Sequence, residues 1–455
     1  MLSADSFWTS SLRSLPAGAS ITRILSAAIN ELDPGEAVAH FVRRDGNLLT
    51  VSDRAYDLHS YRRVVLLGVG KASMAMSDRM ASILDTRLDE ALVIPKHSPN
   101  SIPHMFERNN SRFTIQPGDH PIPGPNSLLA GDKAVRLVSS LGPQDLLICL
   151  ISGGGSALMT APVTGISLPD LQVFTSLLLR CGADIHEFNM FRRRLDKVKG
   201  GGIVKLSNGA TIVSLILSDV VGDALEAIAS GPTAPDPTTC SQVLSILEKY
   251  GLNDQVPPAI LKVLRSSPET SGKPEPVFDR VQNLLVGSNL LAARAALSQA
   301  AAEGFHTCLL RSDLQGEARL VGEEYAATLR GLRQIQDHGR GPACFVSGGE
   351  TTVKIVGDGK GGRNTELALA SVTGLAGVPG VVLVALATDG EDGTTDASGA
   401  VATGDTLARA SRAGLEPGPF LERNDSYSFF EKLGDLLRPG PTGTNGNDLV
   451  FLFVL

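Results

Sequence analysis

Cysteine is scarce in this chain of 455 residues, and its five cysteines form no CxxC pair. They lie far apart in the sequence, at Cys149, Cys181, Cys240, Cys308 and Cys344. An odd, scattered set argues against a disulfide framework and a thiolate metal site. A reducing, cytoplasmic environment is therefore expected.

Excess positive charge and long apolar runs are also missing. The chain has 41 Lys and Arg residues against 48 Asp and Glu residues, a net charge of −7. This balance argues against nucleic acid or a membrane surface as a partner. No stretch reaches the roughly 20 apolar residues of a membrane span. We expect a cytoplasmic protein that binds small molecules, not nucleic acid or a membrane, and a homodimer is compatible with this sequence.

Glycine is abundant, with 48 residues, and short apolar runs alternate with helical patterns. Strands are predicted at 62–68, 91–95, 112–116, 145–152 and 211–219, and then at 282–287, 307–311, 342–347, 352–356, 380–387 and 448–454. This alternation predicts two α/β domains with mostly parallel, doubly wound, Rossmann-like sheets and a ligand cleft between them. The predicted domains are 1–265 and 277–455, joined by a polar linker at 266–276.

A glycine turn containing Gly70 and Lys71 follows the first predicted strand and opens a helix. Free N–H groups at a helix start attract anions, and a lysine there adds a full positive charge. The turn is not a dinucleotide fingerprint, because Ser73 replaces the third glycine and the next strand is followed by Lys96, not an acidic residue. A phosphate or carboxylate is the predicted ligand, and a turn packed for space with a solvated lysine is the alternative.

A second glycine turn follows the strand predicted at 145–152. Its residues are Ser152, Gly153, Gly154, Gly155 and Ser156, which we call the triple-glycine turn. Consecutive glycines let backbone N–H groups close on an anion without obstruction by side chains. The turn is predicted to hold phosphate groups, and a flexible turn without a ligand is the alternative.

Acidic residues follow three other predicted strands. Asp219 and Asp389 are candidates for positioning a hydrated Mg²⁺, which needs only one or two protein oxygens. Glu350 follows the strand predicted at 342–347. The acidic loop after Asp389 is not an EF-hand, because Ala400 stands where its last glutamate would be. Capping of turns by these carboxylates is the alternative interpretation.

Cations also collect at glycine turns in this acidic chain. Lys199 directly precedes three glycines, and Arg363, followed by Asn364, begins a predicted helix after two glycines. An arginine at a glycine-flanked helix start can hold a phosphate or carboxylate through two hydrogen bonds. The run of three arginines at 192–194 is more typical of a solvated helix face.

Ten segments together resemble the glycerate 2-kinases, whose C-terminal half is called the MOFRL domain. The segments are 68–72, 118–123, 152–156, 199–201, 218–223, 228–233, 347–352, 361–364, 387–390 and 440–445. They span nearly the whole chain and occur in the family's order.

The resemblance implies transfer of the γ-phosphoryl group of ATP to the 2-hydroxyl of D-glycerate, with Mg²⁺. It implies catalytic roles for Lys71 and Arg363, to which our interpretation of the strand ends adds Asp219 and Asp389. The residues expected to bind ATP or substrate are Gly70, Ser152, Gly153, Gly154, Gly155, Ser156, Lys199, Glu350, Asn364 and Asn445. One departure is Ala224, where family members often have a second aspartate; it weakens the case for a paired carboxylate there.

Two alternatives remain at this point. One is an NAD(P)H-dependent hydroxypyruvate or tartronate reductase, against which the missing acidic residue after 91–95 argues. The other is a non-catalytic protein that binds sugar acids, which would not need both Lys71 and Arg363.

Overall fold

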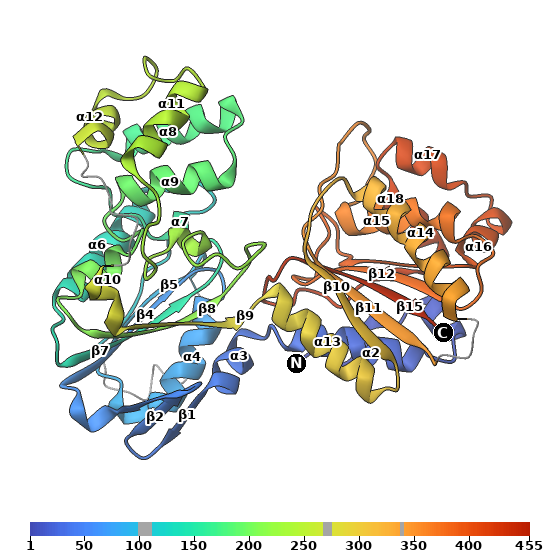
Figure 1. The fold of residues 1–455 in the computed structure, drawn as a ribbon, viewed down its shortest axis with the longest axis horizontal. Coiled ribbons are helices and arrows are strands. Elements are labelled where there is room, and N and C mark those ends of the chain that lie inside the picture. The colour runs from blue at the N-terminus through green and yellow to red at the C-terminus, as the bar shows by residue number, and fades with distance from the viewer. Residues whose placement is uncertain (99–111, 267–274, 337–340) are drawn as a thin grey trace. The chain divides into compact units, whose positions relative to one another are not determined.

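The computed structural model describes residues 1–98, 112–266, 275–336 and 341–455. The chain forms two compact units, which are considered separately (Figure 1). The N-terminal unit is Pro34–Val286, and the C-terminal unit combines Met1–Asp33 with Gly287–Leu455.

The N-terminal unit contains a six-stranded sheet in the order β6-β5-β4-β7-β8-β9. Its strands are β4 (Arg63–Val69), β5 (Glu90–Ile94), β6 (Arg112–Ile115), β7 (Asp145–Ile151), β8 (Thr211–Leu217) and β9 (Val281–Gly287). The four pairings from β6 to β8 are all parallel, which confirms the prediction for this sheet.

Both faces of this sheet are buried. Val64 and Leu66 of β4 pack in one core with α4 (Ser73–Leu84), while Val65 and Leu67 pack in another with α6 (Pro125–Ser139). Alternate side chains of a strand point to opposite faces, so a strand that is apolar at every position contributes side chains to two cores. Coverage by helices on both sides leaves the strand ends as the places where polar groups meet.

Two smaller layers complete the N-terminal unit. A three-stranded antiparallel sheet contains β1 (Val42–Asp45), β2 (Leu48–Val51) and β3 (Arg54–Asp57), next to α3 (Pro34–Phe41). A helical group with its own apolar core extends beyond the sheet (Figure 1). It consists of α8 (Leu168–Cys181), α9 (Ile185–Leu195), α11 (Cys240–Lys249) and α12 (Pro258–Ser266). Two short helices, α7 (Gly155–Leu158) and α10 (Gly202–Leu206), follow glycine turns.

The C-terminal unit contains a six-stranded sheet in the order β10-β11-β15-β12-β13-β14. Its strands are β10 (His306–Leu314), β11 (Ala343–Gly349), β12 (Val381–Ala387), β13 (Gly399–Thr403), β14 (Leu436–Leu437) and β15 (Asp448–Val454). One face packs against α2 (Gly18–Asn30) and α13 (Asn289–Ala302). The other packs against α14 (Ala318–Gln336), α15 (Arg363–Leu375), α17 (Pro417–Glu422) and α18 (Ser426–Leu433). Helices α1 (Ser10–Ser14) and α16 (Thr406–Arg412) each contribute a buried residue to one of these two cores.

The α/β class is confirmed, but the prediction of a mostly parallel second sheet is wrong. Among its described strands, β10 and β11 pair in parallel and the other four pairs are antiparallel. Two of these antiparallel pairs involve β15, the last strand, which inserts between β11 and β12 and runs opposite to both. The other two join β12 to β13 and β13 to β14.

Further differences concern single segments. The strand predicted at 282–287 belongs to the first sheet as β9. The segment predicted as a strand at 352–356 forms only an isolated bridge at Thr352, because Ile355 and Val356 are 80% and 60% exposed and have no sheet face to cover. Strand β13 was not predicted, nor were β14 and the three strands of the small antiparallel sheet.

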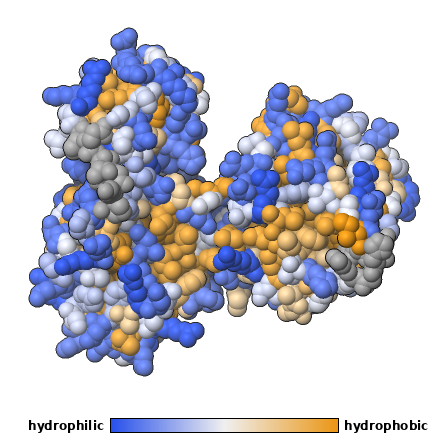
Figure 2. Space-filling view, in the orientation of Figure 1, coloured by the Kyte–Doolittle hydropathy of each residue, from blue (hydrophilic) through white to orange (hydrophobic). Residues whose placement is uncertain are grey.

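The compact units also differ from the predicted boundaries of 1–265 and 277–455. Residues 1–33 pack in the C-terminal unit, because the apolar face of α2 contacts α13. Most of the predicted linker, 267–274, lies outside the described residues. Hydrophilic side chains cover much of the rim of each unit on the face shown in Figure 2. Among the described helices, none is long and apolar enough to cross a membrane.

Candidate functional site

Polar residues of the N-terminal unit gather at the carboxyl edge of its parallel sheet. The ends of β4, β7 and β8 are in register, with Val69 opposite Ile151 and Ile151 opposite Ile216. The segments that carry Lys71, the triple-glycine turn and Asp219 therefore leave the sheet side by side. Such an edge is where ligands bind in open α/β sheets.

Two predicted ligand residues, Gly70 and Ser152, join the turns after β4 and β7. The amide of Lys71 donates to the Gly153 carbonyl at 2.9 Å, and the amide of Ala72 donates to Ser152 Oγ at 3.0 Å. Gly70 has φ +119°, and a Cβ there would lie 2.2 Å from Ser152 Oγ. Only glycine allows the backbone at position 70 to come this close to Ser152, so Gly70 and Ser152 together position Lys71.

Asp219 and Lys71 both reach the triple-glycine turn. A Cβ on Gly153 would lie 1.9 Å from Asp219 Oδ2, so the carboxylate packs against Gly153 in the space that a side chain would occupy. A Cβ on Gly154 would lie 3.4 Å from Lys71 Cε and 3.3 Å from His120 Nε2. A carboxylate, an ammonium group and an imidazole therefore converge on two adjacent glycines, and Lys71 itself remains exposed.

His120 was not predicted as a site residue. Burial lowers the pKa of its imidazole, and the positive charges of Lys71 and Lys96 lower it further. A neutral ring at neutral pH can both donate and accept a hydrogen bond. The signal in the sequence was its place after the strand predicted at 112–116, at the same sheet edge as Lys71.

Two other predicted ligand residues, Ser156 and Lys199, already have polar partners within the N-terminal unit. Ser156 Oγ lies 2.5 Å from Ser230 Oγ, which also bonds to Asn189 Oδ1 at 2.9 Å. Lys199 is buried and forms an ion pair with Asp196 while donating to the Met159 carbonyl at 3.1 Å. Burial lowers the pKa of Lys199, with Asp196 opposing this shift. Its charge is thus neutralised within the protein.

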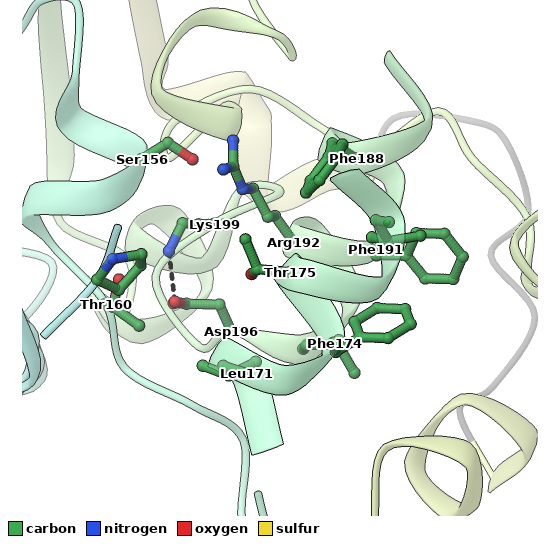
Figure 3. Close-up of a pocket in the computed structure, with 13 residues that line it drawn as sticks. Ser156, Thr160, Leu171, Phe174, Thr175, Phe188, Phe191, Arg192, Asp196 and Lys199 are labelled. Atoms are coloured by element: carbon green, nitrogen blue, oxygen red, sulfur yellow. Dashed lines mark hydrogen bonds and ion pairs between the residues drawn. The ribbon is translucent and has the colours of Figure 1, made fainter. Parts of the chain in front are cut away.

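A cavity of about 40 Å³ adjoins Ser156 (Figure 3). Hydroxyl and charged groups line one part of it, and rings and leucines of α8 and α9 line the other. The lining residues are Pro123, Ser156, Thr160, Leu171, Phe174, Thr175, Leu178, Phe188, Phe191, Arg192, Leu195, Asp196 and Lys199.

A second polar edge lies in the C-terminal unit. In the sheet register, Asp448 at the start of β15 pairs with Gly349 at the end of β11 and with Ala387 at the end of β12. Glu350 and Asp389, which follow those two strands, are therefore brought to the same edge as Asp448.

Arg363 at the start of α15 forms ion pairs with two of these carboxylates. Its Nη2 donates to Asp448 Oδ1 at 3.0 Å, and its Nη1 lies 2.7 Å from Glu350 Oε1. Burial raises the pKa of Asp448 to about 7, although the hydrogen bonds from Arg363 oppose this shift. Burial opposes the charge of Arg363, but its carboxylate partners outweigh that effect and raise its pKa. Asp448 was missed in the sequence, where it only begins an apolar run.

The other predicted residues of this unit are engaged in local structure. The amides of Asn364 and Thr365 donate to Asp392 at 3.0 and 2.8 Å, so a buried carboxylate already caps α15. Asp389 accepts from the Glu391 amide at 3.1 Å, and Asn445 Oδ1 accepts from the Asn447 amide at 2.9 Å. An anion at this edge would therefore depend on the Arg363 side chain, not on the helix N-terminus.

Among the described residues, no group of three or more His, Cys, Asp and Glu side chains could hold a metal ion. Asp219 and Asp389 belong to different compact units. Each is thus considered as a single carboxylate.

Comparison with known proteins decides the family. Residues 20–265 match the family described as a domain of unknown function (DUF4147), and residues 343–448 match the MOFRL family. The glycerate 2-kinase of Pyrococcus horikoshii is 36% identical over 95% of this chain and 96% of its own length. The chain belongs to the glycerate kinase family.

Structural comparison gives the same result. The crystal structure of glycerate kinase from Thermotoga maritima matches with a TM-score of 0.83 and 34% identity, covering 95% of this chain and 98% of that one. A 39% identical protein of Agrobacterium vitis, matched over 85% of this chain and 98% of its own length, carries only a provisional hydroxypyruvate reductase name.

The raised pKa of Asp448 predicts a pH-dependent effect on stability. A carboxyl group whose pKa rises from 3.8 to about 7 on folding stabilises the fold below about pH 4, and this contribution is lost as the pH rises toward 7. Asp448→Asn mimics the protonated form at every pH. We expect the urea midpoint of Asp448→Asn, relative to that of the unchanged protein, to be higher at pH 8 than at pH 5. A relative midpoint that is lower at pH 8 would show that the ion pair with Arg363 outweighs the cost of burying the Asp448 charge.

Proposed function

We propose that this enzyme transfers the γ-phosphoryl group of ATP to the 2-hydroxyl of D-glycerate, giving 2-phosphoglycerate and ADP. The observation that carries the proposal is the convergence of Lys71 and Asp219 on the triple-glycine turn. Membership of the glycerate kinase family supports it. The five cysteines form no disulfide in the structure, which fits action in the cytoplasm.

Phosphoryl transfer requires positioning and neutralisation of charge more than covalent chemistry. In the proposed site, backbone amides of the triple-glycine turn hold phosphate oxygens of ATP. The exposed ammonium group of Lys71 supplies a positive charge next to the same turn. His120, with its lowered pKa, contributes a hydrogen bond without adding a second full charge.

The residues present fit a Mg²⁺ ion bound with the nucleotide. Mg²⁺ keeps most of its waters and takes one or two protein carboxylates together with phosphate oxygens. Asp219 can supply such a carboxylate next to the proposed phosphate site, because its side chain lies against Gly153 of the triple-glycine turn. A side chain at position 153 would displace this carboxylate. Bound there, the ion would neutralise phosphate charge. Asp389, half-buried at the edge of the other sheet, is proposed to orient the substrate hydroxyl or, as a single carboxylate, to position Mg²⁺.

Arg363 is proposed to bind the glycerate carboxylate or the transferring phosphoryl group. Its ion pair with Glu350 is the weaker restraint, because the Glu350 side chain is 43% exposed and exposed pairs contribute only about 0–1 kcal/mol. Asp448, whose side chain is 3% exposed, holds the guanidinium in place. An arriving anion can therefore replace Glu350 at Nη1 while Asp448 maintains the orientation.

Phosphorus NMR of the reaction with ATP, Mg²⁺ and D-glycerate tests the proposal. The expected product spectrum contains ADP and 2-phosphoglycerate. Formation of 3-phosphoglycerate would overturn the regiochemistry, and no consumption of ATP would overturn the kinase. Oxidation of NADH with hydroxypyruvate, followed by absorbance, would establish the reductase instead.

A further inference from the structure

Three consecutive arginines end α9, and they differ in their partners. Arg193 Nε lies 2.7 Å from Asp236 Oδ1, and Arg194 Nε lies 3.4 Å from Asp236 Oδ2. Arg192 lines the cavity beside Ser156 (Figure 3). Within the ranges that the structure describes, no carboxylate lies at ion-pair distance from Arg192.

The surroundings of Arg192 leave its charge uncompensated. Its Nη1 lies 3.5 Å from Asn189 Oδ1, which is a long hydrogen bond, and its guanidinium lies 5.3 Å from the centre of the Phe188 ring. Burial lowers the pKa of Arg192. A partly buried cation without a counter-charge is costly, and an incoming anion would remove that cost.

The neighbouring cation cannot take the same role. Lys199 also lines the cavity, but its ammonium group is paired with Asp196 (Figure 3). An anion near Lys199 would face the Asp196 carboxylate as well. Arg192 is therefore the group in this cavity that offers a net positive charge.

The size of the cavity limits its ligand. The cavity has a volume of about 40 Å³, which exceeds the roughly 10–15 Å³ that a single water requires. A small acid fits such a space. The hydroxyls of Ser156, Thr160 and Thr175 offer hydrogen bonds to the rest of such a molecule.

Ser156 connects the cavity to the proposed phosphate site, because it belongs to both. We propose that this cavity is the subsite for the small hydroxy acid, in which Arg192 binds the carboxylate and leaves the hydroxyl end near the triple-glycine turn. Of the two ligands proposed for Arg363, this assignment leaves it the transferring phosphoryl group. This inference rests on the proposed kinase function. A phosphate oxygen is the other oxyanion that a guanidinium could bind, and the experiment separates the two.

The test compares Arg192→Met and Arg192→Lys with Lys197→Met. Lys197 is exposed on the segment directly after α9, so its variant makes the same change of charge outside the cavity. For Arg192→Met, we expect the KM for D-glycerate to rise about 10–100-fold, the effect of losing a hydrogen bond to a charged group. The KM for ATP should stay within about twofold, because the variant loses no hydrogen bond to the nucleotide. For Arg192→Lys, which keeps the positive charge but lacks the planar guanidinium group, we expect an intermediate KM for D-glycerate. Lys197→Met should have the same KM values as the unchanged enzyme.

Two kinetic results would overturn the assignment. One is an unchanged KM for D-glycerate in Arg192→Met with a matching thermal unfolding curve. The other is a rise in the KM for ATP alone, which would place a nucleotide phosphate at Arg192.

Calorimetric titration with D-glycerate in the absence of ATP distinguishes failure of the subsite from failure of the kinase. Binding to the unchanged protein that is lost in Arg192→Met supports the subsite even if no phosphoryl transfer occurs. Absence of binding to the unchanged protein overturns it.

Discussion

Lys71→Ala is expected to lower kcat with D-glycerate and ATP by about 10²–10³-fold, the usual effect of removing one group that stabilises developing charge. The side chain is exposed, and its Cε lies at the triple-glycine turn. The backbone amide of residue 71, not the ammonium group, makes the hydrogen bond to Gly153. The turn should therefore keep its conformation when the side chain is removed.

Steady-state kinetics and thermal unfolding should be measured together for this variant. Lys262→Ala is the matched control, because Lys262 is an exposed lysine on α12 of the same unit. The control should retain normal kcat, and both variants should unfold at the temperature of the unchanged enzyme. A kcat for Lys71→Ala within threefold of normal would remove Lys71 from the proposed mechanism.

Arg363→Ala is expected to lower kcat by about 10³-fold or more, as for other arginines that stabilise a transferring phosphoryl group. It should also destabilise the C-terminal unit, because the buried Asp448 would lose its partner. Breaking a buried ion pair costs up to about 3–5 kcal/mol, although Asp448 can limit this cost by taking up a proton. Loss of activity in the single variant would therefore mix two effects.

A double variant separates these effects. Arg363→Ala with Asp448→Asn removes the guanidinium without leaving a buried charge, so stability should recover while kcat stays low. Arg330→Ala, an exposed arginine on α14, is the control for loss of one positive charge. Recovery of kcat in the double variant would mean that Arg363 acts only by stabilising the fold.

Much of the N-terminal sheet could be predicted because its signals are local. Runs such as 64–67 and 146–151 are apolar at every position, as strands covered on both faces must be. Glycine turns at their ends are equally visible, so Lys71 and the triple-glycine turn were found at the correct sheet edge. The C-terminal sheet was harder, because the direction and place of β15 depend on pairing between distant segments.

The partners of the polar side chains could not be predicted. Sequence spacing does not distinguish Arg192, which lines a cavity, from Arg193, which is paired with Asp236. Nor does it show that Asp196 neutralises Lys199 or that Asp392 caps α15. These contacts decide whether a charge is available to a ligand.

The sequence by itself determined the α/β class, the family and the glycine turns that place Lys71, because each depends on short patterns of residues. Only the tertiary structure decided that Asp448 holds Arg363, that His120 reaches Gly154 and that Arg192 lacks a carboxylate partner among the described residues. Those facts depend on which side chains meet across segments far apart in the chain, and on how far burial removes them from water.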